Sequence, residues 1–289
     1  MRKCRPARAT GCGVIRESGN NGKAGQVVTK ANFSPRLSLE GKTVVITGAA
    51  QGVGRAIAEM ALDLGANIAA VDLNVAPLES LRDSVGADRL LVAAGDVTDP
   101  MLARKVVAGA VAQFGKVHGL VNNAGITRTA MIEKMSLEAW QQVLDVHLTG
   151  AFHMLQAVGS HLLDHARNGS FEGGSIINIS SDAGRRGTIG QVNYGAAKAG
   201  VLGLTMSAAR EWARYGVRVN SVGFGVIETP MTETLRSEKF RDTYLAQIPL
   251  GRFGTTEEVA SPVCFLLSEA ASYITGQHIW VNGGYTIGS

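Results

Sequence analysis

The chain has 289 residues, with 28 Lys and Arg against 24 Asp and Glu, and 45% of its residues are hydrophobic. This length suits one large α/β domain or two small ones. No apolar run approaches the roughly 18 residues that a membrane helix needs, which argues against a membrane protein. The three cysteines (Cys4, Cys12 and Cys264) cannot build a disulfide framework and form no metal-ligand pair. We therefore expect a cytoplasmic, reducing compartment and no metal.

The net charge of +4 is unevenly distributed along the chain. Residues 1–36 carry eight basic side chains and one acidic one, whereas residues 37–289 carry 20 basic and 23 acidic groups. The first segment lacks apolar periodicity, so we expect residues 1–36 to form a basic, flexible arm and residues 37–289 to form the folded domain. Because nucleic-acid binding needs basic residues clustered on the fold itself, it is not expected.

From residue 37 onward, short β-branched runs alternate with helical patterns. The predicted strands are Thr43–Thr47, Asn67–Asp72, Leu90–Ala94, Gly119–Asn122, Ser175–Ser180, Arg218–Val222 and His278–Val281. The predicted helices are Arg55–Leu64, Asp99–Phe114, Leu137–Leu163, Val192–Arg214 and Glu257–Ser268. Thr255 and Glu258 have the spacing of a capping box at the start of the last helix.

Strands that are apolar throughout and alternate with helices indicate a parallel sheet covered on both faces. We therefore predict an α/β, single-domain, Rossmann-type fold: a doubly wound parallel sheet of about seven strands with helices on both faces. Ligands bind beyond the carboxyl ends of the strands in such sheets.

The first predicted strand runs directly into a glycine-rich turn, Gly48-Ala-Ala-Gln51-Gly52-Val53-Gly54, and then into a helix. Glycines allow a tight turn and let the backbone approach a diphosphate, which the amino end of the helix attracts. The strand before this turn, the helix after it and an acid at the end of the second strand together indicate a dinucleotide site.

That acid is Asp72, which is placed to accept hydrogen bonds from a ribose 2′-hydroxyl. A 2′-phosphate beside this carboxylate would be repelled, and Gln51 offers no positive charge to pair with it. We therefore predict that NAD(H) is preferred over NADP(H). Asp96, at the end of the third strand, either contacts the adenine or caps the turn at Thr98; the sequence leaves both open.

Tyr194 and Lys198 are four residues apart on a predicted helix and so share one face. A nearby ammonium stabilises a phenolate, which makes Tyr194 a candidate acid and base. Ser181, at the carboxyl end of a strand, is placed to hold a carbonyl or alcohol oxygen. The three residues form a set suited to carbonyl–alcohol interconversion.

Together these residues resemble the classical short-chain dehydrogenase/reductase family over residues 39–289, and within it most closely the 3-oxoacyl-(acyl-carrier-protein) reductase subgroup. The matching motifs are Thr47-Gly48-x-x-x-Gly52-x-Gly54, Asn122-Asn123-Ala124-Gly125, Ser181, Tyr194-x-x-x-Lys198, and Ile274-Thr275-Gly276 followed by Val281-Asn282-Gly283-Gly284.

The resemblance implies that Tyr194 is the general acid and base, that Lys198 lowers its pKa and holds the ribose, and that Ser181 orients the substrate oxygen. It also implies a homotetramer. The full set of expected cofactor-binding residues is Gly48, Gln51, Gly52, Val53, Gly54, Asp72, Asp96, Val97, Asn123, Ala124, Gly125, Tyr194, Lys198, Gly225, Ile227 and Thr229.

Two positions depart from the family pattern. His147 stands where the family usually has an asparagine that shapes a helix bulge holding a relay water to the lysine. We include His147 in the catalytic set because its ring also donates and accepts hydrogen bonds, although the change could instead slow the proton relay. Phe224 replaces the family's proline beside the nicotinamide, which loosens a turn and adds an aromatic surface.

The segment 226–250 corresponds to the family's substrate lid. Its apolar residues either pack the lid onto the core or contact an apolar substrate; these are Met231, Leu235, Phe240, Tyr244 and Leu245. Four arginines either meet an acidic carrier or a coenzyme A phosphate, or are simply solvated; these are Arg185, Arg186, Arg214 and Arg218.

The sequence thus predicts an NAD(P)(H)-dependent oxidoreductase whose leading substrate is a 3-oxoacyl thioester. One alternative is an NAD-dependent secondary-alcohol dehydrogenase that works oxidatively, and another is a weakly active nucleotide-binding subunit.

Overall fold

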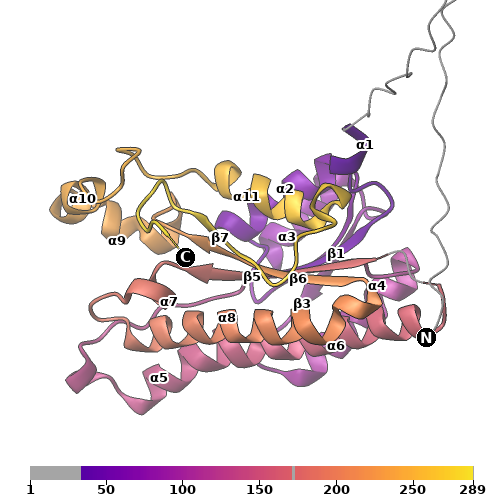
Figure 1. The fold of residues 1–289 in the computed structure, drawn as a ribbon, viewed down its shortest axis with the longest axis horizontal. Coiled ribbons are helices and arrows are strands. Elements are labelled where there is room, and N and C mark those ends of the chain that lie inside the picture. Colours follow the sequence, from indigo (N-terminus) through magenta and orange to yellow (C-terminus); the bar gives the residue numbers. More distant parts are fainter. Residues whose placement is uncertain (1–33, 171–172, 289) are drawn as a thin grey trace, which may run out of the picture. The chain divides into compact units, whose positions relative to one another are not determined.

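A parallel sheet of seven strands organises the computed structural model, which describes residues 34–170 and 173–288 (Figure 1). The strands are β1 (Thr43–Thr47), β2 (Asn67–Asp72), β3 (Leu90–Ala94), β4 (Gly119–Asn122), β5 (Gly174–Ser181), β6 (Val217–Phe224) and β7 (His278–Val281). Their spatial order is β3-β2-β1-β4-β5-β6-β7, and every neighbouring pair is parallel. The predicted doubly wound sheet is confirmed.

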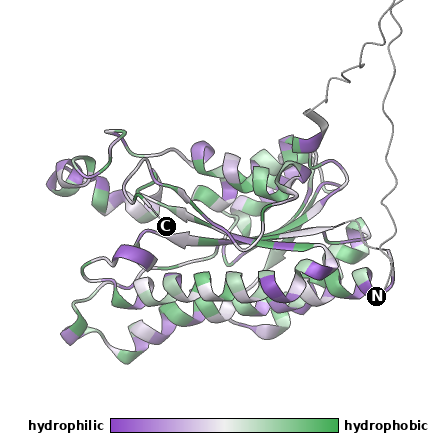
Figure 2. Ribbon diagram, in the orientation of Figure 1, coloured by the Kyte–Doolittle hydropathy of each residue, from purple (hydrophilic) through white to green (hydrophobic). Residues whose placement is uncertain are grey.

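Helices cover both faces of the sheet (Figure 1). One layer contains α2 (Gly52–Asp63), α3 (Val75–Val85) and α11 (Thr256–Leu267), and the other contains α4 (Pro100–Phe114), α6 (Gly150–Arg167) and α8 (Val192–Trp212). Side chains of a strand point alternately to the two faces, so Val44 and Ile46 pack in the first layer and Val45 in the second. Hydrophobic and hydrophilic residues alternate around the long helices, as amphipathic packing requires (Figure 2).

The predicted helix 137–163 is one element in the sequence pattern but three in the structure. It consists of α5 (Leu137–Leu144), a π-helical turn at Asp145–Thr149 and α6. A π turn adds a residue to one helical turn, and such turns are frequent at functional sites. The turn includes His147, whose buried side chain reaches out of the helix toward Ile126.

Other differences concern short helices. Helix α3 was not predicted, and its Pro77 is tolerated because it lies in the first helical turn. No bounds were predicted for the short elements α1 (Ser34–Leu37), α7 (Ala183–Arg186), α9 (Glu233–Arg236) and α10 (Glu238–Leu245). Short 3₁₀ turns lie at Ile132–Lys134, Ala213–Tyr215, Pro230–Thr232 and Glu269–Ala271.

The predicted capping box at the start of α11 is present. Glu258 N–H donates to Thr255 Oγ1, and Thr255 N–H donates to a Glu258 carboxylate oxygen at 3.0 Å. Each side chain therefore satisfies a backbone donor that the helix itself leaves without a partner.

Residues 1–36 are predicted to form a basic, flexible arm, and residues 1–33 of this segment lie outside the described residues. Within the described ranges, no helix combines the length and the apolar character needed to cross a bilayer.

Candidate active site

A cleft of about 670 Å³ lies where β1, β2, β4, β5 and β6 end, at the carboxyl edge of the sheet. This is the edge at which a doubly wound sheet binds its ligands. All the cofactor-binding and catalytic residues predicted from the sequence line this one cleft. The structure therefore brings together residues that are up to 181 positions apart, from Gly48 to Thr229.

The glycine-rich turn after β1 has a backbone that only glycine adopts readily. Gly48 and Gly52 have positive φ angles of 66° and 56°. A Cβ on Gly54 would come within 2.1 Å of the carbonyl oxygen of Gly48, so this position also requires glycine. Asn123 holds the turn from β4 by donating to the carbonyl oxygens of Thr47 and Gly48 at 3.0 and 3.1 Å.

Asp72 lies at the end of β2 and is tied to this turn. Its Oδ2 accepts from the Ala50 N–H at 3.0 Å, and its Oδ1 accepts from the Asn74 N–H at 3.0 Å. A carboxylate has about four lone-pair sites, so both oxygens keep capacity for a ligand in the cleft. The two backbone bonds fix a negative charge at this end of the cleft.

Of the two roles that the sequence left open for Asp96, the structure shows turn capping. Its Oδ1 caps the turn by accepting from the Thr98 N–H at 2.9 Å, and its side chain is exposed and lines the cleft. The turn-capping role is present, and adenine contact stays a prediction.

Ser181, Tyr194 and Lys198 meet at the other end of the cleft. Ser181 ends β5 and lines the cleft together with Tyr194. Burial raises the pKa of Tyr194 and Ser181 partly offsets this rise, so the net direction is opposite to the lowering by Lys198 that the resemblance implies. Lys198 is buried and donates from Nζ to the Ile179 carbonyl oxygen at 2.7 Å, with Nζ 5.7 Å from the centre of the Tyr194 ring. Burial lowers the pKa of Lys198 to about 7.

His147 joins this group from the π turn. Its Nε2 lies 2.7 Å from the Ile126 carbonyl oxygen and 3.0 Å from the Ile126 amide nitrogen, so it bonds one of them according to its tautomer. Burial, together with the positive charge of Lys198, lowers the pKa of His147 to about 3. The ring is therefore neutral at physiological pH. It packs so closely on Gly125 that a Cβ there would lie 2.3 Å from His147 Cε1.

A small cavity of about 10 Å³ separates His147 from Lys198 and Asn122. Two buried polar atoms in its lining, Asn122 Oδ1 and His147 Nδ1, have no hydrogen-bond partner. A single water needs roughly 10–15 Å³ and at least two polar partners. The cavity has the size and the polar groups for one water.

Phe224, the second departure from the family pattern, ends β6 opposite Ser181. Its side chain is buried in the core and also borders the cleft. The Phe224 carbonyl oxygen accepts from the Asp182 N–H at 3.3 Å, so this turn is still tied to the strand that carries Ser181.

Four of the five predicted lid residues either pack on the core or line the cleft, whereas Phe240 does neither and is 36% exposed. Leu235, Tyr244 and Leu245 pack against a small buried cluster of Val226, Ile248 and Phe253. Met231 is half-exposed and lines the cleft.

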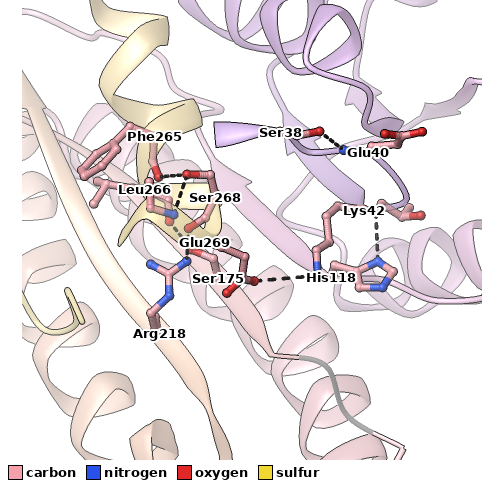
Figure 3. A network of polar contacts seen from close by, with 12 residues as sticks. Ser38, Glu40, Lys42, His118, Ser175, Arg218, Phe265, Leu266, Ser268 and Glu269 are labelled. Atoms are coloured by element: carbon pink, nitrogen blue, oxygen red, sulfur yellow. Dashed lines mark hydrogen bonds and ion pairs between the residues drawn. The ribbon is translucent and has the colours of Figure 1, made fainter. Parts of the chain in front are cut away.

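None of the four arginines for which the sequence left carrier contact or simple solvation open lines the cleft. Arg185 and Arg186 hold the C-terminal segment by donating to the carbonyl oxygens of Gly288 and Tyr285. Arg214 stacks on Tyr215. Arg218 lies at the opposite, amino edge of the sheet, where it donates to the Ser268 carbonyl oxygen at 3.1 Å (Figure 3).

Sequence reasoning missed Arg128, which also lines the cleft. It lies three residues after Gly125, on the loop that leaves the carboxyl end of β4. That position was the available signal, because such loops form the ligand site of this fold. The described residues hold no group of three or more His, Cys, Asp or Glu side chains suited to a metal ion.

Comparison with known proteins agrees with this geometry. The family model described as enoyl-(acyl carrier protein) reductase matches residues 48–286. The chain is 44% identical to 3-oxoacyl-(acyl-carrier-protein) reductase FabG of Thermotoga maritima, over 87% of this chain and all of that one. It is 42% identical to the FabG of Vibrio cholerae, over 86% and 98% of the two chains.

Among solved structures, a short-chain dehydrogenase/reductase (glucose/ribitol dehydrogenase) from Brucella melitensis superposes with a TM-score of 0.80 and 35% identity, covering 86% of this chain and 98% of that one. The chain belongs to the short-chain dehydrogenase/reductase family. It is an NAD(P)-dependent oxidoreductase that interconverts a carbonyl and a secondary alcohol.

Proposed function

We propose that this enzyme uses NADH to reduce 3-oxoacyl thioesters to 3-hydroxyacyl thioesters. The observation that carries the proposal is that Ser181, Tyr194 and Lys198 line the same cleft as the glycine-rich turn, with Lys198 Nζ 5.7 Å from the centre of the Tyr194 ring. The names of the FabG relatives support the choice of a 3-oxoacyl substrate.

The cleft fits a nicotinamide dinucleotide. The N-cap residue of α2, Gln51, makes no side-chain cap hydrogen bond, so the amino end of the helix keeps backbone N–H groups for a diphosphate. Asp72 would bind the hydroxyls of the adenosine ribose and would repel a 2′-phosphate, and this favours NAD(H) over NADP(H). When bound, the nicotinamide supplies the hydride for the substrate carbon.

Tyr194 is the proton donor in this proposal. Its raised pKa keeps the phenol protonated at neutral pH, which is the form that reduction requires. The hydroxyl of Ser181 would hold the substrate oxygen beside the phenol, and Tyr194 gives its proton to that oxygen as negative charge develops. The ammonium of Lys198 then stabilises the phenolate.

His147 completes the set as a hydrogen-bonding group. With a pKa of about 3 its ring does not act as an acid at neutral pH, but a neutral imidazole both donates and accepts hydrogen bonds. We place one water in the cavity between His147 and Lys198, where it would return a proton toward Tyr194. His147 would thus replace the family's asparagine in holding that water.

Oxidation of a secondary alcohol is the second candidate, and Asp72 is the observation that favours it. Oxidative dehydrogenases work with NAD, so the same carboxylate that disfavours NADP is compatible with this direction. The weakly active subunit is disfavoured because Ser181, Tyr194 and Lys198 meet in a single cleft.

We further propose a cytoplasmic homotetramer. Hydrophobic side chains left exposed on the long helices support association; Phe152 on α6 is 44% exposed and Met206 on α8 is 53% exposed. Light scattering of the purified protein would test the oligomeric state.

The test of the function is product analysis. Purified enzyme would be incubated with acetoacetyl-coenzyme A and NADH, and separately with 3-hydroxybutyryl-coenzyme A or a simple secondary alcohol and NAD⁺. We expect 3-hydroxybutyryl-coenzyme A to form rapidly. Rapid oxidation of the simple alcohol without reduction of the thioester would favour the second candidate.

A further inference from the structure

Arg128 is the one exposed cation among the described residues that line the cleft; the other cation, Lys198, is buried. Asp72 and Asp96 lie at the opposite end, beside the glycine-rich turn, and the third carboxylate of the lining, Asp145, accepts from Gln141 Nε2 at 2.7 Å. The positive charge of Arg128 therefore belongs to the end of the cleft where Tyr194 and His147 lie.

The backbone of Arg128 is fixed next to the catalytic tyrosine. Its carbonyl oxygen accepts from Asn193 Nδ2 at 3.0 Å, and Asn193 is fully buried and directly precedes Tyr194. Two residues further on, the Ala130 N–H donates to the Gly190 carbonyl oxygen at 3.0 Å. The loop is thus attached to the segment that leads into α8.

The guanidinium is also oriented. Arg128 Nε donates to Gln142 Oε1 at 3.0 Å, and Gln142 is held in turn because its Nε2 donates to a Glu138 carboxylate oxygen at 3.1 Å. Arg128 Nη1 donates to the Thr127 carbonyl oxygen at 2.9 Å. These bonds leave both hydrogens of Nη2 without a partner among the described residues.

No carboxylate of the described residues lies within ion-pair distance of Arg128. An oriented arginine with free donors, unpaired charge and a place on the cleft wall is suited to a planar or tetrahedral anion. Structural arginines, by contrast, use their donors within the fold, as Arg89 does with Asn67, Leu62 and Ala66.

We propose that Arg128 binds an anionic group of the substrate and makes the enzyme selective for carbonyl compounds that carry a carboxylate or a phosphate. The inference rests on the proposed reduction at Tyr194. The two anions represent two sources: the carboxylate of a short oxo acid, or a phosphate of the carrier to which an oxoacyl group is linked.

Three substrates with the same acetoacetyl carbonyl separate these sources. Acetoacetate carries a carboxylate, acetoacetyl-coenzyme A carries phosphates, and acetoacetyl-N-acetylcysteamine is neutral. Kinetics would be measured for wild type, Arg128→Ala and Arg128→Lys, with Arg104→Ala as the control because Arg104 is an exposed arginine on α4 outside the cleft.

For Arg128→Ala we expect the KM of at least one anionic substrate to rise about tenfold or more, with little change in kcat. The KM of the neutral thioester and of NADH should not change, and Arg104→Ala should behave as wild type. Arg128→Lys should recover part of the loss, because it keeps the charge but not the planar fork. The difference in KM between wild type and Arg128→Ala should become smaller as salt is added, because salt screens the charge of Arg128. The substrate whose KM rises in Arg128→Ala identifies the anionic group, carboxylate or phosphate, that Arg128 binds.

Unchanged kinetics with both anionic substrates would overturn the role of Arg128 and leave the proposed reduction intact. An equal loss with all three substrates would show a structural role and would also overturn it. If wild type reduces none of the three, the proposed function fails, and this inference fails with it.

Discussion

His147 stands edge-on to the ring of Tyr194, with the ring centroids 5.0 Å apart and the planes at 90°. The same imidazole is fixed by Ile126 on one side and packs on Gly125 on another. A residue that departs from the family pattern is therefore in direct contact with the proposed proton donor. Its role can be separated from that of Tyr194 by substitution.

Replacing His147 tests the proton relay. His147→Ala should lower kcat about tenfold and leave the KM for NADH unchanged, because the water beside Lys198 loses a partner. His147→Asn should recover most of the activity, since an amide also donates and accepts. A larger solvent isotope effect on kcat in His147→Ala than in wild type would identify proton transfer as the affected step. Equal activity of wild type, His147→Ala and His147→Asn would remove His147 from the catalytic set.

The burial of His147 also predicts a pH dependence of stability. Its pKa is lowered from 6.5 to about 3, so between these values the unfolded chain binds a proton that the folded chain does not. The free energy of unfolding therefore falls as the pH drops from 6.5 toward 3, by up to about 4 kcal/mol from this group. Urea unfolding of wild type and of His147→Asn should be measured across this pH range. The free energy of unfolding should fall less with decreasing pH in the variant than in wild type. Parallel curves would contradict the burial of a neutral imidazole.

Removing the hydroxyl of Tyr194 tests the proposed acid. Tyr194→Phe should reduce kcat by about 10²-fold or more, while NADH still binds with an affinity near that of wild type. The matched control is Tyr215→Phe, because Tyr215 lies outside the cleft and stacks on Arg214. Cofactor binding is read by fluorescence titration. If Tyr194→Phe keeps wild-type turnover, another group must supply the proton.

Much of this fold could be predicted because its strands are apolar throughout and its turns carry glycine where a Cβ would clash. Five of the seven strands have the predicted bounds, and β5 and β6 are longer at both ends, where Gly174 pairs with Val217 and Ser181 pairs with Phe224. The candidate catalytic residues could be placed near one another for a similar reason: Ser181 lies at a strand end, and Tyr194 and Lys198 share one helix face.

Periodicity could not show the π turn, because Asp145–Thr149 keeps an apolar pattern compatible with a continuous helix. At this turn the His147 side chain contacts Ile126, which is 21 residues away in the sequence and is not visible to a local pattern. The orientation of Arg128 could not be predicted from the sequence for the same reason, because it depends on a hydrogen bond to Gln142 from another element.

Asp72 predicts cofactor selectivity. Asp72→Ser should raise the KM for NADH about tenfold and should improve the use of NADPH, because the negative charge beside the 2′ position is removed. The variant should be compared with Asp63→Ser, which removes an exposed carboxylate at the end of α2, outside the cleft. A loss of NADH affinity in both variants alike would indicate a general electrostatic effect in place of contact with the ribose.

The most direct test of the whole account is the steady-state reduction of acetoacetyl-coenzyme A by the purified enzyme, with NADH and NADPH measured in parallel. The account predicts rapid turnover with a kcat/KM at least about tenfold higher for NADH. A preference for NADPH would contradict the role of Asp72, and the absence of turnover with either cofactor, despite measurable binding, would contradict the proposed 3-oxoacyl substrate.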